Sequence, residues 1–440
     1  MNVTGIIAEY NPFHNGHAYH IRQAREMTGA DFCVAVMSGD YTQRGEPALL
    51  DKYVRTEMAL ANGIDLVLEL PVAFACASAP RFAAGAVALL HKLGVVDCLA
   101  FGSECGDVDT LSEIAAVPAA EPPLYTNTLK DALRRGLSYP AANADALLAY
   151  FASPTGQSHR PAADDAEKLA ALLASPNNVL GIEYCKSLLT LRSPIRPVTV
   201  LRRGSSYSDP GFSDPCNASA LAIRTALRPQ AETGTESLHG QADGRTARTL
   251  QTIAPYVPAS VLALMQREYG RTFPVFPDTL SRMLHYKLLM EAESGFTRYL
   301  DVSGDLSDRI RNHIPQYEDF TSFCLLLKTK ANTYTRISRC LLHILLDIRK
   351  PETDAENGSA VSYARILGFR REALPLLTAI KGNTAIPLIS KLADAGKLLD
   401  ERALQTLKKD IQAARLYDAL ILHAFQTRLP DETRRQIIRL

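Results

Sequence analysis

The fold is decided by Gly5-Ile-Ile-Ala-Glu-Tyr-Asn-Pro-Phe-His-Asn-Gly-His-Ala-Tyr-His20. Its first residues belong to a short apolar segment, Val3 to Ala8, which is typical of a central parallel strand. Asn11-Pro12 ends that strand, and good helix formers with apolar residues at roughly helical spacing run from His17 to Met27. The stretch therefore predicts a strand, a loop and a helix in direct succession.

Two histidines, His14 and His17, lie at the start of the predicted helix with Gly16 between them. Unpaired backbone N–H groups and the positive end of the helix dipole favour a polyphosphate at that place. The glycine lets the backbone approach a ligand closely. This run matches the HxGH signature of the nucleotidyltransferase superfamily, whose histidines stabilise charge that develops on an α-phosphoryl group. We therefore expect both histidines to be catalytic, the alternative being two packed or surface side chains.

Length and composition exclude a disordered chain. The 440 residues are enough for two or three domains, and 47% hydrophobic with 22% charged residues indicates ordinary globular cores. The formal net charge of +1 neither requires nor excludes a nucleic-acid surface, which would have to be a local patch.

The eight cysteines are scattered without a CxxC pair, which argues against a zinc ribbon or a disulfide framework. We expect reduced thiols and no metal site built by the chain itself. No apolar run reaches transmembrane length, and the N-terminus does not have the pattern of a signal peptide. These observations predict a cytoplasmic protein with no membrane partner.

Further short apolar segments alternate with helical patterns, and they lie at Asp31–Met37, Asp65–Leu70, Cys98–Phe101 and Ile195–Leu201. This alternation predicts an α/β fold with a Rossmann-like, doubly wound parallel sheet, in which ligands bind at the carboxyl ends of the strands. Residues 108–175 are Ala-rich and helix-prone, so we expect a helical insertion there. Arg44, in the polar loop after the second strand, is a candidate catalytic clamp for phosphate or carboxylate, although a solvated surface arginine is the alternative.

A second motif begins where Ser219 precedes an Ala-rich helical run that ends in Arg224. It resembles the SxTxxR signature of the same superfamily, in which a helix N-terminus, its Ser and its Arg hold the β- and γ-phosphates of ATP. Two positions where Thr or Ser is common are Ala here, which reduces the hydroxyl contacts. An ordinary capped helix is the alternative for this stretch alone.

A closer resemblance covers much of the chain. Several segments are similar to those of the bacterial tRNA(Met) cytidine acetate ligase family, namely Glu9–His17, Met37–Gly39, Gln43–Ala48, Asp65–Pro71, Phe101–Glu104 and Pro176–Asn178. The resemblance implies an enzyme that makes acetyl-adenylate from acetate and ATP with Mg²⁺, and then acetylates the wobble cytidine of elongator tRNA(Met).

The resemblance also implies where ATP binds. The implied contacts are Ile7, Ala8, Glu9, Tyr10, Asn11, Pro12, Phe13, His14, Asn15, Gly16, His17, Ala18, Tyr19, His20, Gly102, Asn177 and Arg202, joined by Ser219 and Arg224. Arg203 is adjacent to Arg202, so the sequence leaves open which of the two contacts the nucleotide.

After about Thr249 the strand pattern gives way to long helical stretches. We expect residues 1–232 to form the ATP-binding catalytic domain and residues 246–440 an all-α domain, with the boundary in the polar, Gly-rich segment between them. Two basic and aromatic clusters in the second part predict tRNA contacts at Lys328, Tyr334, Arg336, Arg339 and Arg365. The alternative for any one of them is a solvated helix face.

Two other functions remain open from the sequence. The chain could be a metabolic adenylyltransferase that joins AMP to a phosphorylated cofactor precursor, with the helical part serving oligomerisation or regulation. It could also be a catalytically idle RNA-binding protein that retains a nucleotide fold. The sequence does not give the oligomeric state.

Overall fold

The computed structural model describes residues 1–157, 166–202, 218–228, 250–350 and 361–440. One mixed sheet runs through it in the order β5-β4-β1-β2-β3-β6-β7, and β8 also pairs with β6. The strands are β1 Val3–Ala8, β2 Phe32–Ser38, β3 Leu66–Leu70, β4 Cys98–Ser103, β5 Arg196–Leu201, β6 Ala364–Phe369, β7 Leu388–Ile389 and β8 Ile438–Arg439.

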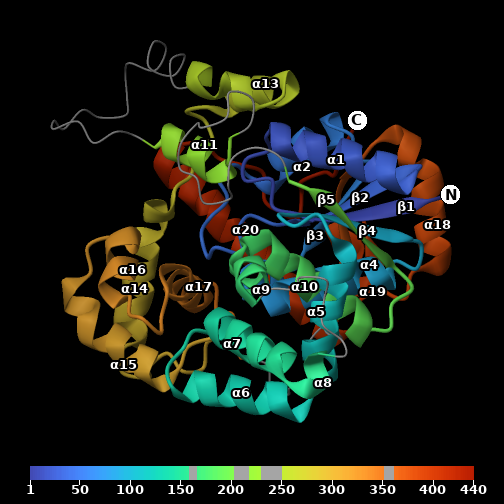
Figure 1. Ribbon diagram of the computed structural model, residues 1–440. Helices are drawn as coiled ribbons and strands as arrows, with labels where there is room; N and C mark the ends of the chain where they lie inside the picture. Colours follow the sequence, from blue (N-terminus) through green and yellow to red (C-terminus); the bar gives the residue numbers. More distant parts are fainter. Residues whose placement is uncertain (158–165, 203–217, 229–249, 351–360) are drawn as a thin grey trace.

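The first five strands are mutually parallel and confirm the predicted doubly wound sheet, with β1 in its centre between β2 and β4. Their crossovers include α1 (Asn15–Thr28), α2 (Lys52–Ala61), α4 (Ala79–Lys92) and α10 (Pro176–Thr190). Figure 1 shows α1 and α2 on one side of the sheet and α4 on the other. All five carboxyl ends therefore meet at one edge, where this architecture binds ligands.

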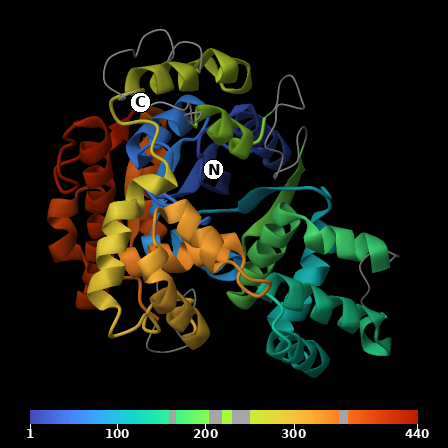
Figure 2. The same ribbon diagram turned by 90° about the vertical axis from the view of Figure 1, so that its left-hand side faces the viewer.

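Between β4 and β5 the chain forms α5 (Val108–Ala120), α6 (Pro123–Arg134), α7 (Tyr139–Ala152), α8 (Pro154–Gln157) and α9 (Ala166–Ala174). The helices α6 and α7 pack on each other and form a lobe away from the sheet (Figure 2). α11 (Ala220–Leu227) follows β5. The predicted boundary between residues 233 and 245 lies outside the described residues.

The C-terminal half is mostly helical, with α13 (Ala259–Glu268), α14 (Ser281–Glu291), α15 (Gly304–His313), α16 (Phe320–Leu327), α17 (Tyr334–Leu345), α18 (Leu374–Asn383), α19 (Ala395–Leu398) and α20 (Glu401–Phe425). Short helical turns also occur at α3 (Val72–Ala75), η1 (Ala254–Tyr256), η2 (Pro277–Leu280), η3 (Ile314–Gln316), η5 (Arg371–Ala373) and η6 (Leu392–Asp394). No helix among the described residues is both long and apolar enough to cross a membrane.

The prediction that this half is all-α is wrong, because β6, β7 and β8 extend the sheet beyond β3. β6 pairs antiparallel with β3, and all six of its residues are buried. Gly368 permits the close packing, since a Cβ atom there would lie 2.7 Å from Thr56 Cγ2 and 2.9 Å from Ile438 Cβ. β6 forms because its residues pair with β3, which is remote in sequence, so local sequence patterns did not predict this strand.

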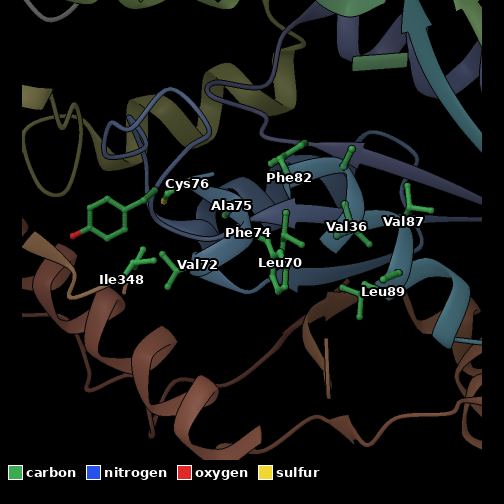
Figure 3. Close-up of a cluster of buried hydrophobic side chains, with 14 of the residues drawn as sticks. Val36, Leu70, Val72, Phe74, Ala75, Cys76, Phe82, Val87, Leu89 and Ile348 are labelled. Atoms are coloured by element: carbon green, nitrogen blue, oxygen red, sulfur yellow. The ribbon is translucent and has the colours of Figure 1, made fainter. Parts of the chain in front are cut away.

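The two largest hydrophobic clusters among the described residues each contain side chains from both halves of the chain. On one side of the sheet, Leu70 and Phe82 belong to the same cluster as Ile348 of the C-terminal half (Figure 3). On the opposite side, Phe13 and Met265 share a second cluster. The two halves therefore share one sheet and two cores.

A buried ion-pair network, here called the seam network, joins the halves and consists of Asp40, Lys52, Glu69, Arg365 and Glu432. Lys52 Nζ lies 2.8 Å from Glu69 Oε1, 2.5 Å from Glu432 Oε1 and 3.4 Å from Asp40 Oδ2. Arg365 lies 2.8 Å from Glu69 Oε2 and 2.6 Å from Glu432 Oε1. Each cation thus meets at least two carboxylates, which satisfies the rule that buried charges must be paired.

Candidate active site

The loop after β1 carries the site, and its aromatic side chains fix its shape. Tyr10 has a left-handed backbone with φ of 48°, which a non-glycine residue adopts only when its surroundings impose it. Tyr10 and Phe13 are both buried. Their ring centroids lie 5.0 Å and 5.5 Å from that of His17. The two rings therefore hold the His17 imidazole in place.

His14 and His17 cap the helix α1 reciprocally. The N–H of Gly16 donates to His14 Nδ1 at 3.0 Å, and the N–H of His14 donates to His17 Nδ1 at 3.2 Å. The ring centroids are 3.8 Å apart. Because each Nδ1 accepts a hydrogen bond, each neutral imidazole carries its proton on Nε2. Two N–H donors are thus held together beside the helix N-terminus.

The surroundings keep these imidazoles neutral. Burial lowers the pKa of His14 to about 3, with Arg202 and Arg224 adding to the effect. Burial, His14 and Arg202 lower the pKa of His17 well below its ordinary value. Burial and Arg202 lower the pKa of His20 to about 4, against a hydrogen bond to the Phe101 backbone. At neutral pH the site therefore offers hydrogen-bond donors beside fixed guanidinium charges, which suits a polyphosphate.

Residues from β4, β5 and α10 meet at the adjacent strand ends. A Cβ atom on Gly102 would lie 3.4 Å from Arg202 Cγ and 3.9 Å from His20 Cδ2, so these three residues line one space. Asn177, at the start of α10, donates through Nδ2 to Glu104 Oε1 at 2.7 Å. The structure thus places Gly102 beside Arg202 and His20, and Asn177 against the segment that follows β4. Arg203 lies outside the described residues.

The second signature, Ser219 to Arg224, lies at α11 and contacts the loop after β1. Ser219 caps α11, its hydroxyl oxygen accepting from the N–H of Ala222 at 3.0 Å. Arg224 donates to the carbonyl oxygen of Asn11 at 2.7 Å. Although the two motifs are some two hundred positions apart in sequence, this hydrogen bond connects them directly.

Arg44 lies in the loop after β2, which is tied to the loop after β1. The N–H of Gln43 donates to Glu9 Oε1 at 2.7 Å, and the N–H of Leu49 donates to Asn11 Oδ1 at 2.7 Å. A cavity of about 170 Å³ opens here and is lined by Arg44, Glu46, Pro47, Leu49, Leu221, Arg224, Thr225, Arg228, Val275, Phe276 and Pro277. We call it the arginine cavity.

Sequence reasoning missed Glu46, Arg228 and Phe276 as members of this site. Arg228 follows Arg224 by four positions and directly follows the last residue of α11, a spacing that could have identified it. Phe276 comes from a distant part of the chain, and no local pattern points to it.

Four of the predicted tRNA contacts lie on or just before α17, which packs on the Arg44 loop. Ser338 Oγ donates to the carbonyl oxygen of Gly45 at 2.9 Å, and a Cβ atom on Gly45 would lie 2.3 Å from the Arg339 nitrogen. Lys328 is exposed, and Tyr334, Arg336 and Arg339 are partly buried. Arg339 Nε is buried and has no hydrogen-bond partner among the described residues.

The fifth predicted contact, Arg365, does not face an RNA surface. It is 4% exposed and forms ion pairs with Glu69 and Glu432 in the seam network. A basic residue beside aromatic ones resembles an RNA contact in sequence, but here burial in β6 makes it structural. Among the described residues, no group of three or more His, Cys, Asp or Glu side chains is placed to hold a metal ion.

Comparisons with known proteins find relatives that match nearly the whole chain. A family model described as HIGH Nucleotidyl Transferase matches residues 1–432. The chain is 36% identical to the tRNA(Met) cytidine acetate ligase of Clostridium kluyveri over 96% of this chain and 95% of that protein. It is 35% identical to the ligase of the same name from Halothermothrix orenii, over 99% and 97%.

A solved structure extends the similarity to three dimensions. Thermotoga maritima TmcAL, crystallised with alpha-thio ATP, matches with a TM-score of 0.87 and 30% sequence identity, covering 100% of both chains. The similarity therefore includes the C-terminal half as well as the parallel sheet.

Proposed function

The chain belongs to the HIGH nucleotidyl transferase family, and on this premise we propose that it is an ATP-dependent tRNA(Met) cytidine acetate ligase. The observation that carries the proposal is the pair of neutral imidazoles at the N-terminus of α1. Arg224 is held beside them by its hydrogen bond to the carbonyl oxygen of Asn11, in the same loop. These groups suit the triphosphate of ATP, whose analogue is bound in the Thermotoga maritima structure. A protein that modifies tRNA acts in the cytoplasm, where we place it.

In the first step, an oxygen of acetate attacks the α-phosphorus of ATP. The new bond joins that oxygen to phosphorus, the bond from phosphorus to the bridging oxygen breaks, and pyrophosphate leaves. The Nε2–H groups of His14 and His17 donate to oxygens whose charge grows in the transition state. Arg202, Arg224 and Ser219 bind the departing phosphates, and Arg44 is the clamp nearest the incoming substrate. Mg²⁺, carried by the phosphates, supplies further charge neutralisation.

In the second step, the exocyclic amine of the wobble cytidine attacks the acetyl carbon. The new bond joins nitrogen to carbon, the bond from carbon to the adenylate oxygen breaks, AMP leaves and the amine loses one proton. The mixed anhydride is already activated, so the protein must mainly position the base and exclude water. α17 packs on the loop that carries Arg44 and presents Tyr334, Arg336 and Arg339. We therefore propose that α17 binds the anticodon loop of the tRNA.

Isotope exchange between labelled pyrophosphate and ATP tests the first step. We expect exchange with acetate and Mg²⁺ in the absence of tRNA, and acetylcytidine when unmodified tRNA(Met) is added. Acetyl-CoA without acetate and ATP should give neither product. Acetylation that uses acetyl-CoA, or exchange that requires a phosphorylated metabolite instead of acetate, would overturn the proposal.

A further inference from the structure

The arginine cavity lies directly against the loop after β1, which carries Asn11 and His14. Two of its lining residues hydrogen-bond to Asn11, three positions before His14: Leu49 donates to the side-chain oxygen and Arg224 to the backbone oxygen, each at 2.7 Å. Its other wall is the segment Val275–Pro277, which the N–H of Val275 attaches to the carbonyl oxygen of Leu49 at 3.0 Å. A ligand in this cavity would thus lie beside the loop that carries His14, between the two halves of the chain.

The size of the cavity excludes ATP itself. Pockets that enclose drug-sized ligands have volumes of about 300–1,000 Å³, whereas this one has about 170 Å³. A ligand of the size of a nucleobase, or a small anion such as acetate, would fit in this cavity.

The lining combines donors, one acceptor and an aromatic ring. Arg44, Arg224 and Arg228 supply guanidinium N–H groups, and Glu46 supplies a carboxylate. Phe276 supplies the ring, with Arg228 Cζ 6.0 Å from its centroid. Burial raises the pKa of Glu46, and the charges of Arg224, Arg44 and Arg228, which line the same cavity, oppose that rise. A carboxylate in the cavity repels acetate but accepts from an amine.

We propose that the arginine cavity binds the wobble cytosine and distinguishes it from uracil. This inference rests on the proposed function. Glu46 accepts a hydrogen bond from the exocyclic amine of the base, which is the pairing that carboxylates make with cytosine. Arg228 donates to the acceptors on the same edge, and Phe276 stacks on the splayed base, as aromatic side chains do in single-stranded RNA recognition. The amine is thereby held beside the acetyl-adenylate.

Uracil presents the opposite pattern on that edge. A carbonyl oxygen replaces the amine and would face the Glu46 carboxylate, and a ring N–H would face the arginine donors. Both mismatches leave polar groups of the base and of the cavity unpaired, so a tRNA with uridine at the wobble position should bind about tenfold or more weakly.

The test compares dissociation constants for unmodified tRNA(Met) and its wobble-uridine counterpart. In the Glu46→Gln variant the side-chain amide can donate to the uracil oxygen, so the roughly tenfold preference for cytidine should fall to about threefold or less. The matched control is Glu57→Gln, which removes a carboxylate that also pairs with an arginine, Arg267, but lies outside the cavity. That control should keep the wild-type ratio. An unchanged ratio in Glu46→Gln would overturn the proposal.

Arg228→Ala decides the question if Glu46→Gln does not fold, because Arg228 is exposed and its truncation leaves the core intact. We expect it to reduce the cytidine preference and to lower tRNA acetylation far more than acetate-dependent exchange. A raised KM for acetate in both variants, with the base preference intact, would instead make this an acetate pocket and overturn the proposal. Wild-type protein without acetate-dependent exchange would refute the proposed function, whereas the ratio of dissociation constants would still test the cavity.

Discussion

The seam network and the candidate active site are both polar clusters beside the sheet, but their charged and polar groups are paired in different ways. In the seam network, Lys52 and Arg365 are surrounded by the carboxylates of Glu69 and Glu432, all of them buried. In the active site, imidazoles kept neutral by burial lie among arginines, and His20 Nε2 has no hydrogen-bond partner among the described residues. In the seam network the cations are paired with carboxylates of the same chain, and these pairs stabilise the fold. The candidate active site has more hydrogen-bond donors and cations than acceptors, which suits the binding of an anion.

The largest effect should come from breaking the seam network. Glu432→Ala leaves two buried cations with fewer counter-charges, and loss of one partner of a buried pair typically costs about 3–5 kcal/mol. Lys52 and Arg365 lower the pKa of Glu432 to about 2 despite its burial, which is consistent with a strong interaction. Urea unfolding measures the change in the free energy of unfolding.

Asp131→Ala is the control, since its ion pair with Arg134 is exposed and such pairs contribute about 0–1 kcal/mol. A Glu432→Ala protein as stable as this control would show that the network does not hold the two halves together.

The second effect concerns catalysis without loss of fold. His14→Ala and His17→Ala should each lower acetate-dependent exchange by about 10²–10³-fold, the usual result of removing one donor to a developing charge. The unfolding free energy should change far less than in Glu432→Ala. His423→Ala, which removes an exposed imidazole from α20, should retain wild-type exchange. If His14→Ala kept full exchange, the active site could not be assigned to this loop.

The third effect is a pH dependence specific to the active site. The pKa of His14 is lowered to about 3 and that of His20 to about 4, so the unfolded chain binds these protons first as pH falls. Stability is then fully present above about pH 6.5 and decreases below it, by about 1.4 kcal/mol per histidine at pH 5.5. Bound ATP should reduce this loss, because its negative charge favours the protonated imidazoles. Urea titrations at pH 7.5 and 5.5, with and without ATP, measure both quantities.

The smallest effect belongs to two cations near α17, the exposed Lys328 and the partly buried Arg336. Lys328→Ala and Arg336→Ala should weaken tRNA binding severalfold while leaving exchange without tRNA close to wild type. Each phosphate contact removed should lower the slope of log affinity against log salt by about 0.7–0.9. Filter binding at several salt concentrations gives the slope, and Lys397→Ala on the short helix α19 serves as the control. Loss of exchange in these variants would contradict the division of roles.

The sequence predicted the strand, loop and helix that carry the candidate active site better than it predicted the connection between the halves. Val3–Ala8 and the cap at His14 depend on local patterns, namely an apolar β-branched run and residues suited to a helix start. The prediction that Arg365 contacts tRNA was wrong because its ion-pair partners, Glu69 and Glu432, are remote in sequence. Phe276 was missed for the same reason. Local patterns report local structure, and long-range partners must be seen in the fold.

The pairing of β3 with β6 also has a consequence for synthesis on the ribosome. The edge of β3 is made early, but its partner begins only at Ala364. At about 5–20 residues per second, that edge waits roughly 15–60 s for β6 to emerge. During the wait it presents unpaired backbone groups and a cationic Lys52 without Glu432, a state prone to edge-to-edge association. A nascent chain therefore needs protection at this edge until translation is nearly complete.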